Sequence, residues 1–287
     1  MQLRYAYNTN GAANHRLADA LRLIAESGYD GVALTLDHHH FDPFAADFER
    51  RAAELKKTLD ELNLGLVVET GARFLLDPTE KHEPTLISPT AAGRRKRIEF
   101  LKRAVDLAEI TNAEAVSFWA GVKKETVSAD QAQAFLREGL REICEYAAAK
   151  NVALAFEPEP GMLIETVADY QSLSREFANL KLALDTGHCL ASDECEPEAA
   201  VRRMRAQIGT VAVEDMRRGV HEHLFFGEGE MNFPAILAAL KEINYEKLVS
   251  VELSRHAHCA DVIIPAAIEF LRKTEEELAT KSKEIAA

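Results

Sequence analysis

The sequence has only four cysteines, and their spacing excludes the Cys-x-x-Cys motif of zinc and redox sites. Its 287 residues include Cys144, Cys189, Cys195 and Cys259 and no other cysteine. None of the four is spaced as Cys-x-x-Cys, and Cys144 falls inside a helical pattern. We therefore expect scattered reduced thiols in a cytoplasmic protein rather than a disulfide framework.

Long hydrophobic runs and an excess of basic residues are also missing. No apolar run approaches the roughly 18 residues that span a bilayer, and the N-terminal MQLRYAYNTNG lacks the pattern of a signal peptide. The 34 Lys and Arg residues are outnumbered by 47 Asp and Glu residues, which gives a formal net charge of -13. This charge argues against a mainly electrostatic grip on nucleic acid or on an anionic membrane.

Alternating strand and helix patterns fill the rest of the chain, and with 47% hydrophobic residues it can bury a large core. Apolar runs typical of buried strands cover residues 3–8, 31–36, 64–70, 115–121, 152–157, 182–185, 210–214 and 248–252. Helical spacing covers residues 16–27, 45–62, 93–110, 129–150, 166–177, 198–208, 234–243 and 261–278. Thr166 is a plausible helix N-cap. Residues 279–287 are charged and polar and are expected to fray.

Eight strand–helix units without a break in composition predict one α/β domain over residues 1–287, built around a parallel sheet. Eight is the number that closes a (β/α)8 TIM barrel. An open doubly wound sheet is the runner-up, but no Gly-x-Gly-x-x-Gly follows the first strand. The long loop from Gly71 to Pro89, which carries Arg73, Lys81 and His82, is more often functional than idle at such a length.

Candidate chemistry gathers where the predicted strands end. In LALDTGH, Asp185 ends a strand and His188 follows a Thr-Gly turn, which places a carboxylate and an imidazole within reach of a divalent metal. The inward-facing residues at the other strand ends are Glu69, Trp119, Glu157, Glu214 and Glu252. Any single carboxylate here is most simply a solvated strand end or an ion-pair partner. For Glu157, Asp185 and Glu252 together a metal is more probable, because converging carboxylates repel one another without a cation.

Two further segments add to this picture. In VHEHL, His221 and His223 would share one face if the segment is extended, and with His188 they form a possible second metal site. Two exposed loop histidines explain the pattern about equally well. The Gly-rich GEGEMNF run, residues 227–233, is either an ordinary loop or an amide cradle for a substrate oxyanion or phosphate.

With these motifs the chain resembles the xylose isomerase-like TIM barrels, a superfamily of sugar isomerases, ketose 3-epimerases, inosose dehydratases and endonuclease IV. The matching pieces are AFEPEPG with Glu157, LALDTGH with Asp185, VAVEDM before GEGEMNF, and LVSVEL with Glu252. The resemblance implies Glu157, Asp185 and Glu252 as metal ligands. It also implies that the two glutamates flank the substrate as acid and base, as they do in the epimerases.

One departure concerns the seventh strand, where the family usually carries a His ligand in a His-x-x-Asp pattern. Ala212 stands at that position here, ahead of Asp215. Glu214 or His221 is the candidate replacement, and we expect His221, because an imidazole preserves the charge of the usual ligand set whereas Glu214 would add a fourth carboxylate.

These observations favour a metal-dependent isomerase or epimerase acting on a sugar or a related polyhydroxylated carbonyl compound, with Mn, Mg, Co or Zn as the ion. Glu157 and Glu252 would transfer the proton. Glu69, Trp119, Lys123 and Arg255, with His256, are the candidates to orient the substrate. A solvated surface charge explains Lys123, Arg255 and His256 equally well.

Two alternatives stay open. A Zn-dependent hydrolase or lyase is supported by His188, His221 and His223. The net charge argues against nucleic acid as its substrate, but the basic run from Arg94 to Arg97 leaves that alternative open. That run is otherwise the solvated start of a helix. A barrel with a degraded site that only binds a metabolite is supported mainly by Ala212. A small sugar-like molecule is the expected partner, no membrane is expected, and assembly as a homo-oligomer stays open.

Overall fold

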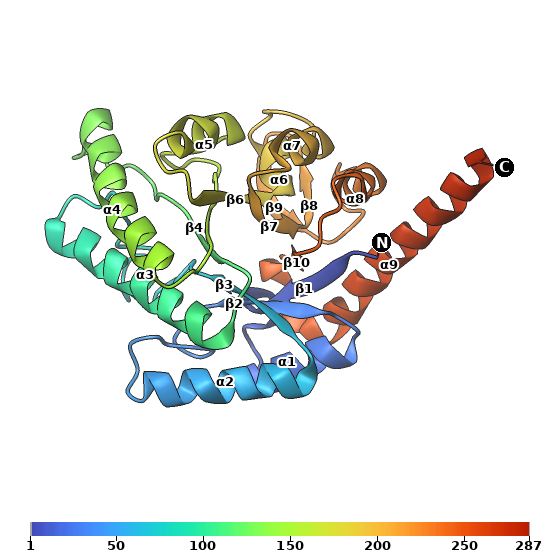
Figure 1. The fold of residues 1–287 in the computed structure, drawn as a ribbon, viewed down its shortest axis with the longest axis horizontal. Coiled ribbons are helices and arrows are strands. Elements are labelled where there is room, and N and C mark those ends of the chain that lie inside the picture. The colour runs from blue at the N-terminus through green and yellow to red at the C-terminus, as the bar shows by residue number, and fades with distance from the viewer. Residues whose placement is uncertain (1, 287) are drawn as a thin grey trace.

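A computed structural model describes residues 2–286 of the chain. Eight parallel strands form a closed barrel in the order β1-β10-β7-β6-β5-β4-β3-β2, with the helices outside it (Figure 1). The barrel strands are β1 (Arg4–Asn8), β2 (Gly31–Thr35), β3 (Gly65–Glu69), β4 (Val116–Phe118), β5 (Leu154–Phe156), β6 (Leu180–Asp185), β7 (Ile208–Val213) and β10 (Leu248–Val251). The predicted eight-stranded parallel barrel is confirmed.

The helices follow the predicted order with a few differences in extent. They are α1 (Leu17–Glu26), α2 (Phe48–Leu62), α3 (Ala91–Thr111), α4 (Ala129–Ala149), α5 (Val167–Ser174), α6 (Thr186–Ala191), α7 (Pro197–Met204), α8 (Phe233–Glu242) and α9 (Ala260–Ala286), with 3-10 turns η1 (Thr9–Ala12) and η2 (Ser254–Cys259). Thr166 is confirmed as an N-cap, since its side chain accepts a hydrogen bond from the Asp169 amide.

Several segments differ from the sequence expectation: the strand expected over residues 115–121 covers only Val116–Phe118, and the helix expected over residues 166–177 ends at Ser174. Three further differences bear on the barrel and the site. The helix expected to reach Ile208 ends at Met204, because Ile208 already pairs with Leu182 in the barrel. The last helix does not stop at Leu278 but continues to Ala286, past the barrel (Figure 1); Ala287 lies outside the described residues. The short helix α6 begins directly after β6, where the sequence suggested a loop.

Small side chains fill the barrel interior and bring the strands close around the site. Ala115, Ala155 and Ala183 form one buried cluster, and Ala6, Ala33 and Val67 pack with Leu248 in another. The larger apolar side chains face outward and pack under the helices; on α1, Ala20, Leu21 and Ile24 are the buried face. Because the interior residues are small, the polar side chains at the strand ends have room to converge.

An antiparallel hairpin, β8 (Asp215–Arg217) with β9 (Val220–Leu224), follows β7 and carries the VHEHL segment. This segment is extended, as the one-face placement of His221 and His223 requires.

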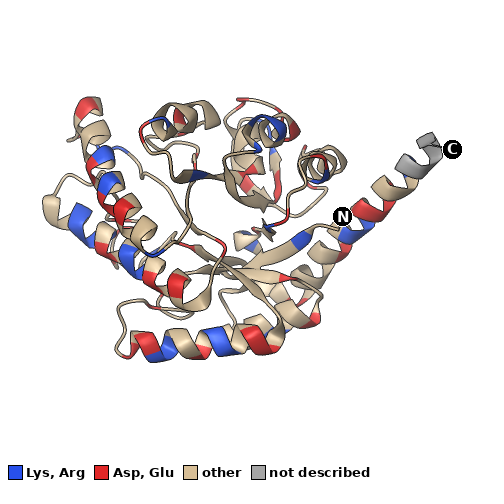
Figure 2. Cartoon of the chain, in the orientation of Figure 1, with Lys and Arg blue, Asp and Glu red and all other residues tan. Residues whose placement is uncertain are grey.

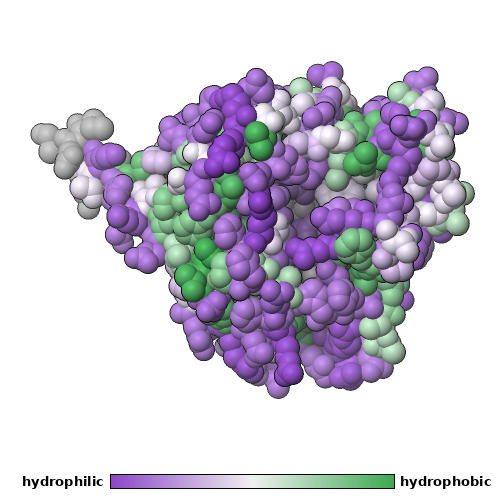
Figure 3. All heavy atoms as spheres, turned by 180° about the vertical axis from the view of Figure 1, so that it is seen from behind, coloured by the Kyte–Doolittle hydropathy of each residue, from purple (hydrophilic) through white to green (hydrophobic). Residues whose placement is uncertain are grey.

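The exterior is polar and mixed in charge. Acidic and basic residues alternate along the outer helices, most plainly on α2 and α3 (Figure 2). The face seen in Figure 3 is mainly hydrophilic, with hydrophobic residues in small separate groups. No helix within the described residues combines the length and apolarity needed to cross a bilayer.

Candidate active site

A cavity of about 700 Å³ opens at the C-terminal ends of the strands. Ten of the residues singled out from the sequence line it, namely Glu69, Arg73, Lys81, His82, Trp119, Glu157, His188, His221, His223 and Glu252. A smaller cavity of about 30 Å³ lies next to it, and Asp185, Glu157 and Glu252 contribute to its wall beside Ala212. The fold thus brings the predicted carboxylates and histidines to one place.

Glu157 and Glu252 are fixed at the two sides of this site by the ends of β5 and β10. The Glu157 amide donates to the Phe118 carbonyl (2.8 Å) and the Glu252 amide to the Val213 carbonyl (3.1 Å), so both residues continue the sheet pattern. The Asn10 side chain donates to Oε1 of Glu252 (2.8 Å) and sets its orientation. Burial, followed by the charges of Glu159 and Asp185, raises the pKa of Glu157 well above its usual value.

Asp185 has one carboxylate oxygen engaged and one without a partner. Oδ1 accepts hydrogen bonds from the amides of Gly187 (2.8 Å) and His188 (3.1 Å), which makes Asp185 the N-cap of α6. Oδ2 is buried without a hydrogen-bond partner among the described residues and lies 3.6 Å from Nε2 of His188. Burial would raise the pKa of Asp185, but the charge of His188 and the neighbouring Glu214 side chain outweigh it and lower the pKa, so Asp185 is an ionised carboxylate.

His188 offers a free ring nitrogen to the same spot. Its Nδ1 lies 3.0 Å from the Pro158 carbonyl, which can only accept, so Nδ1 carries a proton and Nε2 is the nitrogen that a metal could bind. Burial lowers the pKa of His188, but the charges of Asp185 and Glu159 outweigh it and raise the pKa, so a bound metal would take the place of the Nε2 proton. Nε2 has no hydrogen-bond partner within the described residues. One ligand atom each from Glu157, Asp185 and His188 lie within 4.8 Å of one another. Buried, unpartnered acceptors so close together fit a divalent cation.

A second group of possible ligands adjoins the first. The rings of His188 and His221 are 4.8 Å apart and those of His221 and His223 are 5.3 Å apart. Glu159 lies 3.8 Å from Nδ1 of His188 and 3.7 Å from Nε2 of His221. Glu159, His188 and His221 also meet within 4.8 Å. Burial, followed by His188 and His223, lowers the pKa of His221 to about 4 and keeps its imidazole neutral.

Glu159 is a residue that the sequence interpretation missed. The signal was present in AFEPEPG, where a second glutamate stands two residues after Glu157. Residues beyond a strand end have no fixed parity, so only the structure reveals that Glu159 turns toward the histidines. Asn10, which orients Glu252, lies in η1 and had no sequence signal.

Glu214 lies in a different environment from the rim position expected for it. It is completely buried and does not line the large cavity. It packs against Gly187 and lies beside Asp185, and among the described residues neither carboxylate oxygen has a hydrogen-bond partner of ordinary geometry. Burial, followed by the neighbouring Asp185, raises the pKa of Glu214 well above its usual value, which favours the neutral acid.

The amide cradle expected in the GEGEMNF run is already filled from within the protein. The buried Asp215 carboxylate accepts hydrogen bonds from the amides of Gly227 (2.8 Å), Gly229 (2.9 Å) and Met231 (3.0 Å). These three donors are satisfied by Asp215, so the cradle alternative is wrong and the segment is the ordinary loop that was the other alternative. Asp215 instead fixes the loop that follows the hairpin.

Several charged candidates lie away from the cavity. Lys123 donates to the Val127 carbonyl (3.3 Å), and Arg255 pairs with Glu222 of the hairpin. Neither residue, nor His256, belongs to the cavity wall as described.

The basic run at the start of α3 is not a free patch. Arg97 is fully buried under Trp119 at 4.3 Å, Arg95 pairs with Glu142, and Lys96 bonds to the Leu76 carbonyl. Arg94 donates to the Ser88 carbonyl (2.9 Å) and stacks on Phe135. Each of these four side chains therefore already has a partner within the protein, and Arg97 is removed from the surface altogether.

A profile of known families matches residues 21–274, and its description is a xylose isomerase-like TIM barrel. The chain belongs to this family. Among curated relatives, the L-ribulose-5-phosphate 3-epimerase UlaE of Salmonella paratyphi C (strain RKS4594) is 25% identical over 233 residues, which cover 79% of this chain and 78% of that protein.

Solved structures of this fold superpose over nearly the whole chain. An L-ribulose 3-epimerase gives a TM-score of 0.78 at 19% identity and covers 100% of this chain and 99% of its own. A D-allulose 3-epimerase from Methylomonas sp., solved with D-allulose, gives 0.74 at 21% identity and covers 95% and 97%. The IOLI protein, solved with a bound zinc atom, gives 0.72 at 17% identity and covers 97% and 99%. At these identities the likeness establishes the fold.

Proposed function

We propose that this protein is a metal-dependent epimerase or isomerase of a sugar or a related polyhydroxylated carbonyl compound. The observation that carries the proposal is the placement of Glu157 and Glu252 on the wall of one cavity, next to the unpartnered Oδ2 of Asp185. The sugar epimerases among the relatives support the same reaction class.

Glu157, Asp185 and Glu252 would hold a divalent ion such as Mn, Mg, Co or Zn. When bound, such an ion polarises the substrate carbonyl and acidifies the neighbouring C–H bond. We keep His221 as the further protein ligand, because its imidazole is neutral and exposed to the cavity. Glu214 is the competitor, since it touches Asp185, but it would put a fourth carboxylate against the ion.

The proton transfer belongs to Glu157 and Glu252. A carboxylate on one face of the substrate removes the proton from the carbon beside the carbonyl, and the carboxyl group on the other face returns a proton. Asn10 holds Glu252 in place through Oε1, which leaves Oε2 for this role. The raised pKa of Glu157 suits a group that carries a proton during part of the cycle. Glu69 and Trp119, which line the cavity, would position the sugar.

The test is hydrogen exchange by the purified protein in D2O with a panel of ketoses, followed by proton NMR. The expected result is loss of the signal of one C–H beside the carbonyl and appearance of the epimer, abolished by a chelator and restored by one of the four metals. No exchange with any ketose in the metal-loaded protein would contradict the proposal.

The histidine group supports a second candidate, a Zn-dependent hydrolase or lyase. Glu159, His188 and His221 meet within 4.8 Å, with His223 beside them, and this N/O ligand set suits zinc. Metal analysis separates the two functions. One ion per chain that survives His223→Ala favours the epimerase, whereas a second zinc that this variant loses favours hydrolysis.

A further inference from the structure

Charges on the cavity wall are unevenly divided, with Asp37 and Glu69 near the basic residues and three further carboxylates elsewhere on the wall. The carboxylates Glu157, Glu159 and Glu252 lie at the end formed by β5 and β10. Arg73 and Lys81, both on the long loop between β3 and α3, supply the basic side chains of the wall as described. His38, His39 and His82 lie with them on the wall. The candidate metal site accounts for the acidic end and leaves the basic end without a role.

The loop holds Arg73 in place by contacts with its own backbone. The Gly71 amide donates to Oε1 of Glu69 (2.7 Å), and Nδ1 of His82 lies 2.8 Å from the Gly71 carbonyl. The His82 amide donates to the Arg73 carbonyl (2.6 Å). Ala72 and Arg73 have φ values of 56° and 20°, a region that non-glycine residues rarely adopt. The chain therefore accepts a strained backbone where it presents Arg73 to the cavity.

Neither Arg73 nor Lys81 is held in an ion pair with another described residue, although the charge of Arg73 acts on the nearby Glu69. Arg73 donates one hydrogen bond, to the Asn10 carbonyl (3.3 Å), and no described carboxylate forms an ion pair with Arg73 or Lys81. The positive charges of Arg73 and Lys81 act on the neighbouring imidazole rings. The pKa of His82 is lowered by burial first and then by charges that include Lys81 and Arg73. Unpaired cations on a cavity wall attract an anionic group.

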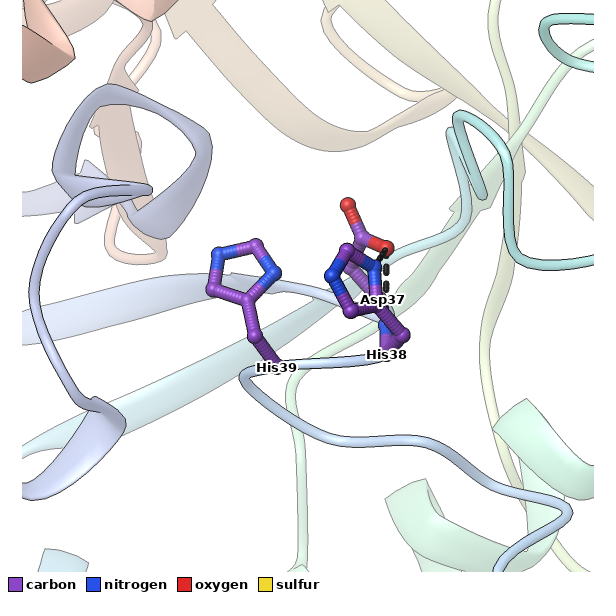
Figure 4. A group of neighbouring side chains, drawn as sticks. All are labelled: Asp37, His38 and His39. Atoms are coloured by element: carbon purple, nitrogen blue, oxygen red, sulfur yellow. Dashed lines mark hydrogen bonds and ion pairs between the residues drawn. The ribbon is translucent and has the colours of Figure 1, made fainter. Parts of the chain in front are cut away.

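A cation site is the competing interpretation of this end, because ligand atoms of Asp37, His38 and His39 lie within 4.8 Å of one another (Figure 4). Oδ1 of Asp37, however, already accepts from the His38 amide (2.7 Å) and faces Nδ1 of the same residue (2.8 Å). Arg73 acts on His39 by lowering its pKa, after the larger effects of burial and of the neighbours Asp37 and His38. A metal here would be repelled by the same guanidinium, so the charges favour an anion.

We propose that the Arg73–Lys81 end of the cavity binds a terminal phosphate monoester of the sugar substrate. The proposal rests on the proposed function and specifies its substrate class. The Arg73 guanidinium can bond two phosphate oxygens at once and Lys81 adds a point charge, whereas a carboxylate carries less charge for the two cations to neutralise. The carbonyl end of the same molecule would then lie among the carboxylates at the opposite end. A cavity of about 700 Å³ is within the range of ligand pockets.

The experiment is calorimetric titration of the metal-loaded protein at constant ionic strength. The ligands are D- and L-ribulose 5-phosphate, the two unphosphorylated ketoses, D-glucuronate and inorganic phosphate. We expect a ketose phosphate to bind at least tenfold more tightly than its ketose. Arg73→Gln and Lys81→Gln should each lower the affinity for the phosphate ester roughly tenfold and leave the affinity for the neutral ketose unchanged.

Two further variants keep the result interpretable. Lys123→Gln removes a positive charge that does not face the cavity, and it should bind every ligand as the wild type does. Arg73→Lys keeps the charge and should recover part of the lost affinity. Circular dichroism of each variant checks that the loop change has not unfolded the barrel.

The inference is overturned if the ketose and its phosphate bind equally, if the glutamine variants behave as Lys123→Gln does, or if glucuronate binds more tightly than the phosphate esters. Loss of a bound metal in His39→Gln would assign this end to a cation and also overturn it. Turnover of unphosphorylated ketoses alone would leave the proposed function standing without this inference. Failure of every sugar to bind or turn over would remove both.

Discussion

The α-carbon of Gly187 lies so close to the Glu214 carboxylate that a Cβ at position 187 would overlap Oε1 of Glu214. The glycine of the Asp-Thr-Gly-His sequence is therefore required by close packing. Because the Gly187 amide also donates to Oδ1 of Asp185, the packing of Gly187 against Glu214 sets the position of Glu214 relative to the candidate metal ligand.

Gly187→Ala should destabilise the protein by about 1–3 kcal/mol, since an added methyl group must displace both the Glu214 and the Met216 side chains. Urea unfolding measures the change. In a Glu214→Ala background the cost should fall, because one of the two obstacles is gone. Strictly additive effects of the two substitutions would show that Glu214 is not the clashing group.

The further protein ligand is decided by comparing metal affinity in His221→Ala, Glu214→Ala and Ala212→His. We expect His221→Ala to lose at least tenfold in affinity, Glu214→Ala to change little, and Ala212→His to gain by restoring the family's ligand. Competition with a chromogenic chelator gives these affinities. If His221→Ala binds as the wild type does and Glu214→Ala loses the metal, Glu214 is the ligand.

Glu157→Gln and Glu252→Gln should each lower the exchange rate in D2O by about 10²–10⁴-fold, the usual contribution of a positioned proton carrier. Thermal unfolding of the variants should still be cooperative. Glu138→Gln, on the exposed face of α4, is the matched control and should leave the rate unchanged. A near-wild-type rate in either site variant would remove that residue from the acid–base assignment.

The metal-free protein should lose stability as pH rises through the titration of Glu69. Burial, followed by the charge of Glu252, raises the pKa of Glu69 from about 4.5 to about 7. Between these values the native state holds a proton that the unfolded state has released, so the stabilisation present below pH 4.5 is lost toward pH 7. Each unit of difference between the two pKa values corresponds to roughly 1.4 kcal/mol.

Urea unfolding in the presence of a chelator, from pH 4.5 to pH 8, tests this. The stability of Glu69→Gln relative to the wild type should increase up to about pH 7 and then stay level, while that of Glu138→Gln should not change with pH. A pH-independent difference for Glu69→Gln would show that Glu69 ionises normally in the folded protein.

The sequence by itself determined the barrel and the strand ends that carry Glu157, Asp185 and Glu252. Apolar periodicity is a local property, set by the two-residue repeat of strands and the 3.6-residue repeat of helices, so it can be recognised without knowing any partner. The same two-residue repeat predicts whether the side chain at a strand end faces the barrel interior or the helices. It therefore predicts that Glu69 and Glu252 face the cavity.

Only the tertiary structure decided how groups beyond the strand ends are paired. Asp215 accepts hydrogen bonds from the amides of Gly227 and Gly229. Glu214 packs against Gly187 at the start of α6 and does not line the large cavity. Glu159 lies next to the histidines of the hairpin. Arg73 lines the cavity from a loop that has neither the strand nor the helix repeat. Each outcome depends on which donor and acceptor lie within about 3 Å across distant parts of the chain, and on the space left by residues such as Gly187 and Ala212. The local repeat of apolar residues does not predict these distances, because they are fixed only when the eight strands close into the barrel.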